Sequence, residues 1–205
     1  MKILVIDLGT SNIRSLTSAL MYLGVQPVVT SDPSAIESAS HVILPGVGAF
    51  DAGMKRIAEL SLAVPLHTYA MEQQRPLLGV CLGMQLLFNE SEEGHLSGLG
   101  LVAGRFRKLK STDQSMHKVP HVGFAPVYGY RETALFKGIG TNAYFYFTHS
   151  YALPGIEEDW NVALCDHAQP FVAAFQRRRI CGVQFHPEKS QSTGLKLLSN
   201  FLELV

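Results

Sequence analysis

Apolar residues in the first half of the chain follow two alternating patterns. Short continuous apolar runs, typical of strands that are buried on both faces, occupy residues 3–7, 25–30, 41–44 and 77–80. An amphipathic helix that ends at Gly24 is predicted by apolar residues spaced three and four apart, at Ile13, Leu16, Leu20 and Leu23. Asp32-Pro33 predicts an N-cap and the start of a further helix. Strands that alternate with helices predict a parallel sheet with right-handed crossovers.

Beyond residue 100 the pattern changes to short strands joined by short loops. The predicted strands are 102–109, 122–128, 144–147, 162–165, 171–176 and 180–185, and we expect several to be antiparallel. A closing amphipathic helix is predicted over 193–204. We therefore expect an α/β fold with an open, mainly parallel central sheet flanked by helices and extra antiparallel strands in the C-terminal half. No linker divides the chain, so a single domain over 1–205 is predicted.

Composition excludes several classes of function. The chain has 205 residues, 47% of them hydrophobic, which suits a globular core. Its 17 basic and 17 acidic residues give no electrostatic support for binding nucleic acid or membranes. No apolar run is long enough for a membrane helix, and the start at Met1 does not resemble a signal peptide. Three cysteines, an odd number, favour a reducing cytoplasm, and no metal or cofactor is expected from their spacing.

A cysteine flanked by glycines offers the first candidate chemistry. Gly79-Val-Cys81-Leu-Gly83 follows an apolar run and precedes a helix-like segment, which is the cysteine version of a nucleophile elbow. The glycines allow the close approach that a sharp strand-to-helix turn requires. A helix N-terminus beneath Cys81 would favour its thiolate. Taken alone, the cysteine could equally be a buried packing residue.

A second element, Gly182 to Glu188, supplies the partners that a nucleophile needs. An apolar strand runs into His186-Pro187-Glu188. On an extended chain, residues two apart point to the same side, so His186 and Glu188 can lie side by side. Cys81, His186 and Glu188 thus provide a nucleophile, a base and an orienting group. A strand-end histidine with a purely structural hydrogen bond is the alternative for any one of the eight histidines.

Three further segments carry weaker signals. The loop 45–50, with the Leu82 backbone N–H, is a candidate oxyanion site, although its glycines and proline are equally typical of a plain turn. The polar end of the aromatic strand, at 148–151, could hold a small ligand through its backbone. The cluster 118–123 suits a solvated loop.

Cys165 and Cys181 are expected in the core, and 177–179 in a charged hairpin turn.

Taken together, these motifs resemble those of the class I, triad-type glutamine amidotransferases. More narrowly, the chain is similar to the family of glutaminase subunits of imidazole glycerol phosphate synthase, which act in histidine biosynthesis. The resemblance extends nearly from end to end. It includes the segments 9–15, 44–48, 79–87, 98–101, 118–123, 146–151 and 184–190.

The resemblance implies a role for each matched residue. Cys81 would attack the side-chain amide of glutamine, His186 would transfer the proton and Glu188 would orient His186. The resemblance also implies an oxyanion hole formed or gated by Gly46, Val47 and Gly48 together with Leu82. Glutamine would be positioned by Gln85, His149, Ser150 and Tyr151.

A partner is implied in the same way, namely a separate (β/α)₈-barrel cyclase that receives ammonia through an internal channel. The interface would include Lys118, His121 and Phe124. The family usually continues Pro-His-x-Gly with Trp-Asn, whereas this chain has Phe124-Ala125. A related subunit that feeds ammonia to surface-sugar amidation is therefore an alternative. A stand-alone cysteine hydrolase and a non-catalytic scaffold are the others. Intracellular peptidases of similar fold place histidine directly after the cysteine, where this chain has Leu82.

Overall fold

A seven-stranded sheet forms the centre of the molecule. The computed structural model describes residues 1–9, 13–110, 118–130, 133–155 and 160–204, so part of the segment 9–15 lies outside the described residues. The strand order is β10-β11-β12-β4-β3-β1-β2, with parallel pairing from β12 to β2 and antiparallel pairing of β10, β11 and β12. The strands are β1 (Ile3–Ile6), β2 (Val28–Thr30), β3 (His41–Gly46), β4 (Leu77–Cys81), β10 (Asn161–His167), β11 (Gln169–Arg177) and β12 (Ile180–Val183).

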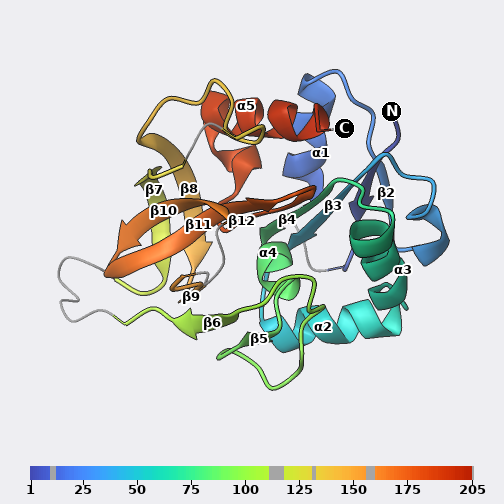
Figure 1. Cartoon of the computed structure of the whole chain (residues 1–205), viewed down its shortest axis with the longest axis horizontal. Coiled ribbons are helices and arrows are strands. Elements are labelled where there is room, and N and C mark those ends of the chain that lie inside the picture. Colours follow the sequence, from blue (N-terminus) through green and yellow to red (C-terminus); the bar gives the residue numbers. More distant parts are fainter. Residues whose placement is uncertain (10–12, 111–117, 131–132, 156–159, 205) are drawn as a thin grey trace.

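Helices cover both faces of this sheet (Figure 1). On one face lie α1 and α5, and on the other lie α2, α3 and α4. The α-helices are α1 (Ile13–Tyr22), α2 (Phe50–Glu59), α3 (Ala63–His67), α4 (Leu82–Leu86) and α5 (Gln191–Leu202). Over the described residues the chain also forms three short helical turns, η1 (Pro33–Ala35), η2 (Thr68–Glu72) and η3 (Pro187–Lys189). In the part of the chain that the structure describes, none of the helices has the length and apolarity to cross a lipid bilayer.

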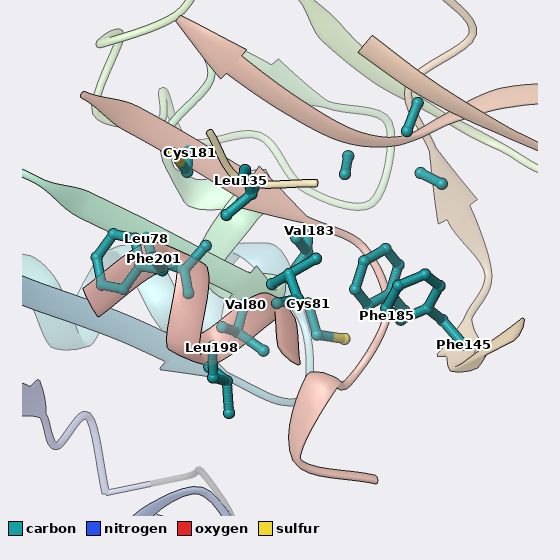
Figure 2. Close-up of a cluster of buried hydrophobic side chains, with 14 of the residues drawn as sticks. Leu78, Val80, Cys81, Leu135, Phe145, Cys181, Val183, Phe185, Leu198 and Phe201 are labelled. Carbon is teal, nitrogen blue, oxygen red and sulfur yellow. The ribbon is translucent and has the colours of Figure 1, made fainter. Parts of the chain in front are cut away.

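The alternation of side chains along each strand divides the core into two layers. Ile3 and Val5 of β1 pack in the layer beneath α1 and α5, whereas Leu4 and Ile6 pack in the layer of α2 to α4. Figure 2 shows the first layer, in which Leu78 and Val80 of β4 lie against Leu198 and Phe201 of α5. Val183 and Phe185 continue the same layer.

Two smaller groups of strands lie beside the central sheet. An antiparallel pair is formed by β7 (His121–Val127) and β8 (Ala143–His149). A three-stranded group has the order β5-β6-β9. Its members are β5 (Glu90–Ser91), β6 (Arg105–Lys108) and β9 (Tyr151–Ala152).

The predicted fold class is confirmed, as are most of the predicted elements. Helix α1 ends as expected, because Gly24 adopts φ +81° and its N–H and that of Val25 bond to carbonyls of the last turn. The strand expected over 25–30 is shorter, because β2 lies at the exposed edge of the sheet. Asp32 caps the next segment as predicted, but that segment is the single turn η1. Helix α2 was not singled out by the sequence pattern.

Candidate active site

Cys81 lies at a strained turn between the end of β4 and the start of α4. Its backbone has φ +55° and ψ −114°, a conformation that costs about 1–3 kcal/mol for a residue with a Cβ atom. The turn brings α4 against β3. A Cβ atom at Gly83 would lie 1.7 Å from the Leu44 carbonyl oxygen, so only glycine fits there. The elbow predicted from the glycine spacing is therefore present, with the cysteine at the carboxyl end of a central parallel strand.

His186 lies beside the cysteine and is held by Glu188. His186 Nδ1 is 2.8 Å from Glu188 Oε1, and both side chains are 5% exposed. The sequence predicted this pairing for the wrong geometric reason. The chain from Pro187 to Lys189 forms the turn η3 rather than an extended strand, and the turn directs the carboxylate back to the ring.

The backbone of this turn is fixed on both sides. The His186 N–H donates to the Tyr146 carbonyl at 2.8 Å. The Ser190 hydroxyl donates to the His186 carbonyl at 2.6 Å and accepts from the Tyr146 N–H at 2.9 Å. These bonds tie the imidazole to β8, so that its position relative to Cys81 does not depend on side-chain packing alone.

Electrostatics around His186 favour its charged form. Burial by itself lowers the pKa of His186, but hydrogen bonds and charge interactions with Cys81 and Glu188 outweigh burial and raise this pKa to about 10. An imidazolium at His186 is thus stabilised from both sides. The arrangement suits a thiolate–imidazolium pair oriented by a carboxylate.

A cavity of about 350 Å³ opens in front of Cys81 and His186. Most residues that the sequence predicted as substrate-binding line it, namely Val47, Gly48, Leu82, Gln85, His149, Ser150 and Tyr151. Gly46 is not in the lining but pairs in register with Cys81 across β3 and β4. Glu188 lies behind His186 and faces a different cavity, which it shares with Arg14 of α1.

Gln85 lines the cavity and contacts the side-chain amide of Gln184, which in turn lies beside Cys81. Gln85 Nε2 donates to Gln184 Oε1 at 3.1 Å and lies 3.5 Å from the Tyr151 carbonyl oxygen. Gln184 Nε2 is in turn 3.8 Å from Cys81 Sγ. Gln85 Oε1 is buried and has no hydrogen-bond partner among the residues that the structure describes. Gln184 was not proposed from the sequence, although its position directly before Phe185-His186 was a signal that could have found it.

Glu93 is a cavity residue that sequence reasoning missed. Its Oε2 accepts from the Phe50 N–H at 2.8 Å and so caps α2. Burial raises the pKa of the Glu93 carboxyl, which also faces the cavity. Lys189, Pro120 and Thr148 complete the lining. Thr148 belongs to the strand end 148–151 that the sequence offered as a ligand contact, and Lys189 follows Glu188 directly.

The three residues predicted at a partner interface differ in accessibility. Phe124 is 48% exposed, and Lys118 is exposed as well. Val122 and Tyr144 are exposed beside Phe124 on β7 and β8, which forms an apolar surface. His121 is only 4% exposed, so its side chain offers almost no surface to a partner. The alternation along β7 turns His121 inward while Val122 and Phe124 face outward.

The other two cysteines lie where the sequence predicted. Cys165 and Cys181 are free thiols in the core. Burial raises the pKa of Cys165 to about 12, and burial also raises the pKa of Cys181. Neither thiol is suited to act as a nucleophile at neutral pH.

Comparison with known proteins agrees with this geometry. The family model for class-I glutamine amidotransferases matches residues 4–205. The chain is 42% identical over 208 residues to the imidazole glycerol phosphate synthase subunit HisH of Nitrosomonas europaea, covering 98% of this chain and 97% of that one. It is 44% identical over 199 residues to the protein of the same name in Xanthomonas oryzae pv. oryzae, covering 97% and 96%.

Among solved structures, the fold is similar to that of a putative GMP synthase subunit from Thermoplasma acidophilum. The TM-score is 0.75 at 21% identity, covering 100% of this chain and 93% of the other. At this identity the likeness concerns the fold alone. It shows that the central sheet and its flanking helices are arranged as in that structure.

Proposed function

The chain belongs to the class-I glutamine amidotransferase family, and on that premise we propose that it is the glutaminase subunit of an imidazole glycerol phosphate synthase. The observation that carries the proposal is the position of Cys81 at the elbow, next to a His186 that is held by Glu188. The relatives at 42–44% identity are named as subunits of that synthase and cover nearly the whole chain. Its substrate is glutamine, and the ammonia it releases serves histidine biosynthesis.

The reaction follows from the charges at the site. Cys81 Sγ, as the thiolate, attacks the side-chain carbonyl carbon of glutamine and forms a C–S bond. The His186 imidazolium gives its proton to the leaving nitrogen as the C–N bond breaks, and ammonia departs. Water then gives a proton to His186 and attacks the thioester carbon. Cleavage of the C–S bond releases glutamate and restores the thiolate–imidazolium pair.

The cavity lining supports roles for the residues around the substrate. The Leu82 N–H is the first of α4 and has no acceptor inside that helix, so it can bind the oxyanion together with N–H groups of the segment 46–48. Gln85 and the backbone of 149–151 position the side-chain amide. The Glu93 carboxylate suits the α-ammonium group of glutamine.

We propose a separate (β/α)₈-barrel cyclase as the partner. The exposed apolar surface of Val122, Phe124 and Tyr144, beside exposed Lys118, supports an interface on β7 and β8. Cys81 Sγ lies 3.8 Å from the Thr148 carbonyl oxygen at the end of β8, so this face adjoins the nucleophile. Transfer through an internal channel keeps ammonia unprotonated, which matters because ammonium is not a nucleophile.

The proposal is tested by mixing the chain with the cyclase, its ribonucleotide ligand and glutamine. We expect the ligand-loaded partner to raise glutamine turnover about tenfold or more. Phe124→Ser should remove most of the stimulation, whereas Val64→Ser, an exposed apolar control on α3, should not. Glutamine turnover without any stimulation would favour the sugar-amidation alternative, which the Phe124-Ala125 sequence keeps open. Partner-free cleavage of peptides would favour a stand-alone hydrolase.

Replacing Glu188 by glutamine should move the alkaline limb of the pH–rate profile to lower pH. The amide oxygen can still accept from His186 Nδ1, but the negative charge that favours the imidazolium is lost. The pKa of His186 therefore falls from about 10, and the imidazolium loses its proton at lower pH. We expect a shift of about 1–3 pH units, with a lower kcat. Glu203→Gln, an exposed control, should leave the profile unchanged. An alkaline limb that stays in place in Glu188→Gln contradicts the assignment.

We also propose that residues 1–205 form one domain that works in the cytoplasm. Strands from both halves of the chain share the central sheet, which supports a single folding unit. The free state of Cys81, Cys165 and Cys181 supports a reducing compartment.

A further inference from the structure

Three histidine rings lie together in an aromatic layer next to the glutamine cavity, with two of them stacked and the third, His149, edge-on to His121. They come from β7, β8 and β10 as His121, His149 and His167. His121 is sandwiched between Phe147, at 4.8 Å between ring centroids, and His167, at 3.9 Å, and is nearly parallel to both. His121 and His149 are direct partners in the antiparallel register of β7 and β8. Of the three, His149 reaches the lining of the cavity.

The hydrogen bonds indicate which nitrogen of His149 carries a proton and which group donates between His121 and His149. His149 Nδ1 lies 2.9 Å from the Tyr151 carbonyl oxygen, which can only accept, so Nδ1 carries the hydrogen. Burial lowers the pKa of His149 to about 4, and the nearby His167 and His186 act in the same direction. His149 is therefore neutral at pH 7, and its Nε2 is an acceptor. His121 Nδ1, 3.1 Å away, must be the donor.

The hydrogen bonds from His121 through His149 end at the Tyr151 carbonyl, which is part of the glutaminase site. The Tyr151 oxygen accepts from His149 and lies 3.5 Å from Gln85 Nε2. Tyr151 also lines the cavity together with Gln85. Loss of the His149 bond would remove one of the contacts that orient the Tyr151 carbonyl within β9, so Gln85 would have a less firmly oriented partner.

We propose that His121 and His149 are positioning residues for glutamine. His121 donates to His149, and His149 donates to the Tyr151 carbonyl. These two hydrogen bonds hold Tyr151 and Gln85, which line the cavity, in the geometry that binds glutamine. The proposal rests on the proposed glutaminase function. It assigns His121, which is buried, to substrate positioning instead of to direct contact with a partner.

Two substitutions at His121 separate positioning from packing. His121→Phe keeps a ring between Phe147 and His167 but lacks the N–H that His149 needs. His121→Asn loses the ring but places an amide N–H where Nδ1 was. Both variants lack Nε2, so the loss of that atom affects them alike, and they differ in the ring and in the Nδ1–H donor, which act on stability and on positioning respectively.

We expect the two His121 variants to rank in opposite orders by activity and by thermal stability. His121→Phe should keep the higher Tm yet lose about tenfold in kcat/KM for glutamine, mainly through KM, as one lost neutral hydrogen bond predicts. His121→Asn should unfold at lower temperature but stay within about twofold of wild type in kcat/KM. Activity that follows the order of Tm would overturn the proposal.

An NMR measurement that needs no turnover separates a failure of the positioning proposal from a failure of the proposed glutaminase function. Long-range ¹H–¹⁵N correlation spectra at pH 7 should show His149 as the Nδ1–H tautomer in wild type. A neutral Nε2–H tautomer or an imidazolium at His149 would overturn the positioning role. If the wild-type protein fails to hydrolyse glutamine, alone or with the cyclase, the proposed function is refuted. The spectra would still show which tautomer His149 adopts.

Discussion

Cys81→Ala is expected to abolish glutamine hydrolysis while leaving ammonia-dependent synthesis by the complex intact. In the proposed reaction the Cys81 thiolate forms the thioester. Neither Cys165 nor Cys181 can replace it, because both are fully buried and neither lines the cavity. Removal of a nucleophile lowers turnover by a factor on the order of 10⁴ or more. Ammonia supplied from solution bypasses the lost step, so the proposed cyclase should still make its product.

The two readouts together exclude a folding defect. Alanine keeps the Cβ atom, so the strained backbone at φ +55° is no more crowded than in wild type. Cys165→Ala is the matched control, since it removes a thiol that is fully buried and absent from the cavity lining, and it should retain glutamine hydrolysis. Loss of ammonia-dependent synthesis in Cys81→Ala would show that the variant no longer assembles. Residual glutamine hydrolysis near the wild-type rate would remove Cys81 from the mechanism.

The sequence was most informative where a short run of residues determines the local backbone structure. The elbow needs two small residues around one nucleophile, and that need is visible in Gly79-Val-Cys81-Leu-Gly83. The apolar runs of β1, β3 and β4 indicated the parallel core for a similar reason, since strands buried on both faces consist mainly of apolar residues. The pairing of His186 with Glu188 was predicted, but η3 rather than strand alternation produces it.

The sequence was least informative where folding joins distant elements. Glu93 reaches the cavity only because the segment after β5 folds back to cap α2, and nothing near residue 93 indicates this. His121 looked like part of a solvated polar cluster. Its burial follows from the register with His149 and from stacking on Phe147 and His167, which come from other strands. Pairing partners in antiparallel strands depend on tertiary packing, which local propensity does not encode.

Gly83→Ala should prevent the elbow from forming and strongly destabilise the whole fold. The new Cβ atom would lie 1.7 Å from the Leu44 carbonyl oxygen and 2.8 Å from the Leu44 carbonyl carbon, distances that no side-chain rotation can relieve. Leu44 lies within β3 and is in register with Gly79 of β4, so β3 cannot retreat without breaking the central pairing. We expect a loss of about 4 kcal/mol or more in the free energy of unfolding, because backbone must move against backbone.

Urea unfolding measures this loss, with Gly155→Ala as the control. Gly155 is exposed, and apart from its chain neighbours no described residue has an atom within 4 Å of a Cβ atom built there, so its substitution should change the free energy by no more than about 0.5 kcal/mol. A Gly83→Ala variant with an unchanged urea midpoint would mean that α4 can move away from β3. In that case the elbow would not be rigid, and the approach of Cys81 to His186 could not rest on the packing of α4 against β3. The stability of this one glycine variant thus tests whether the site geometry is built into the backbone.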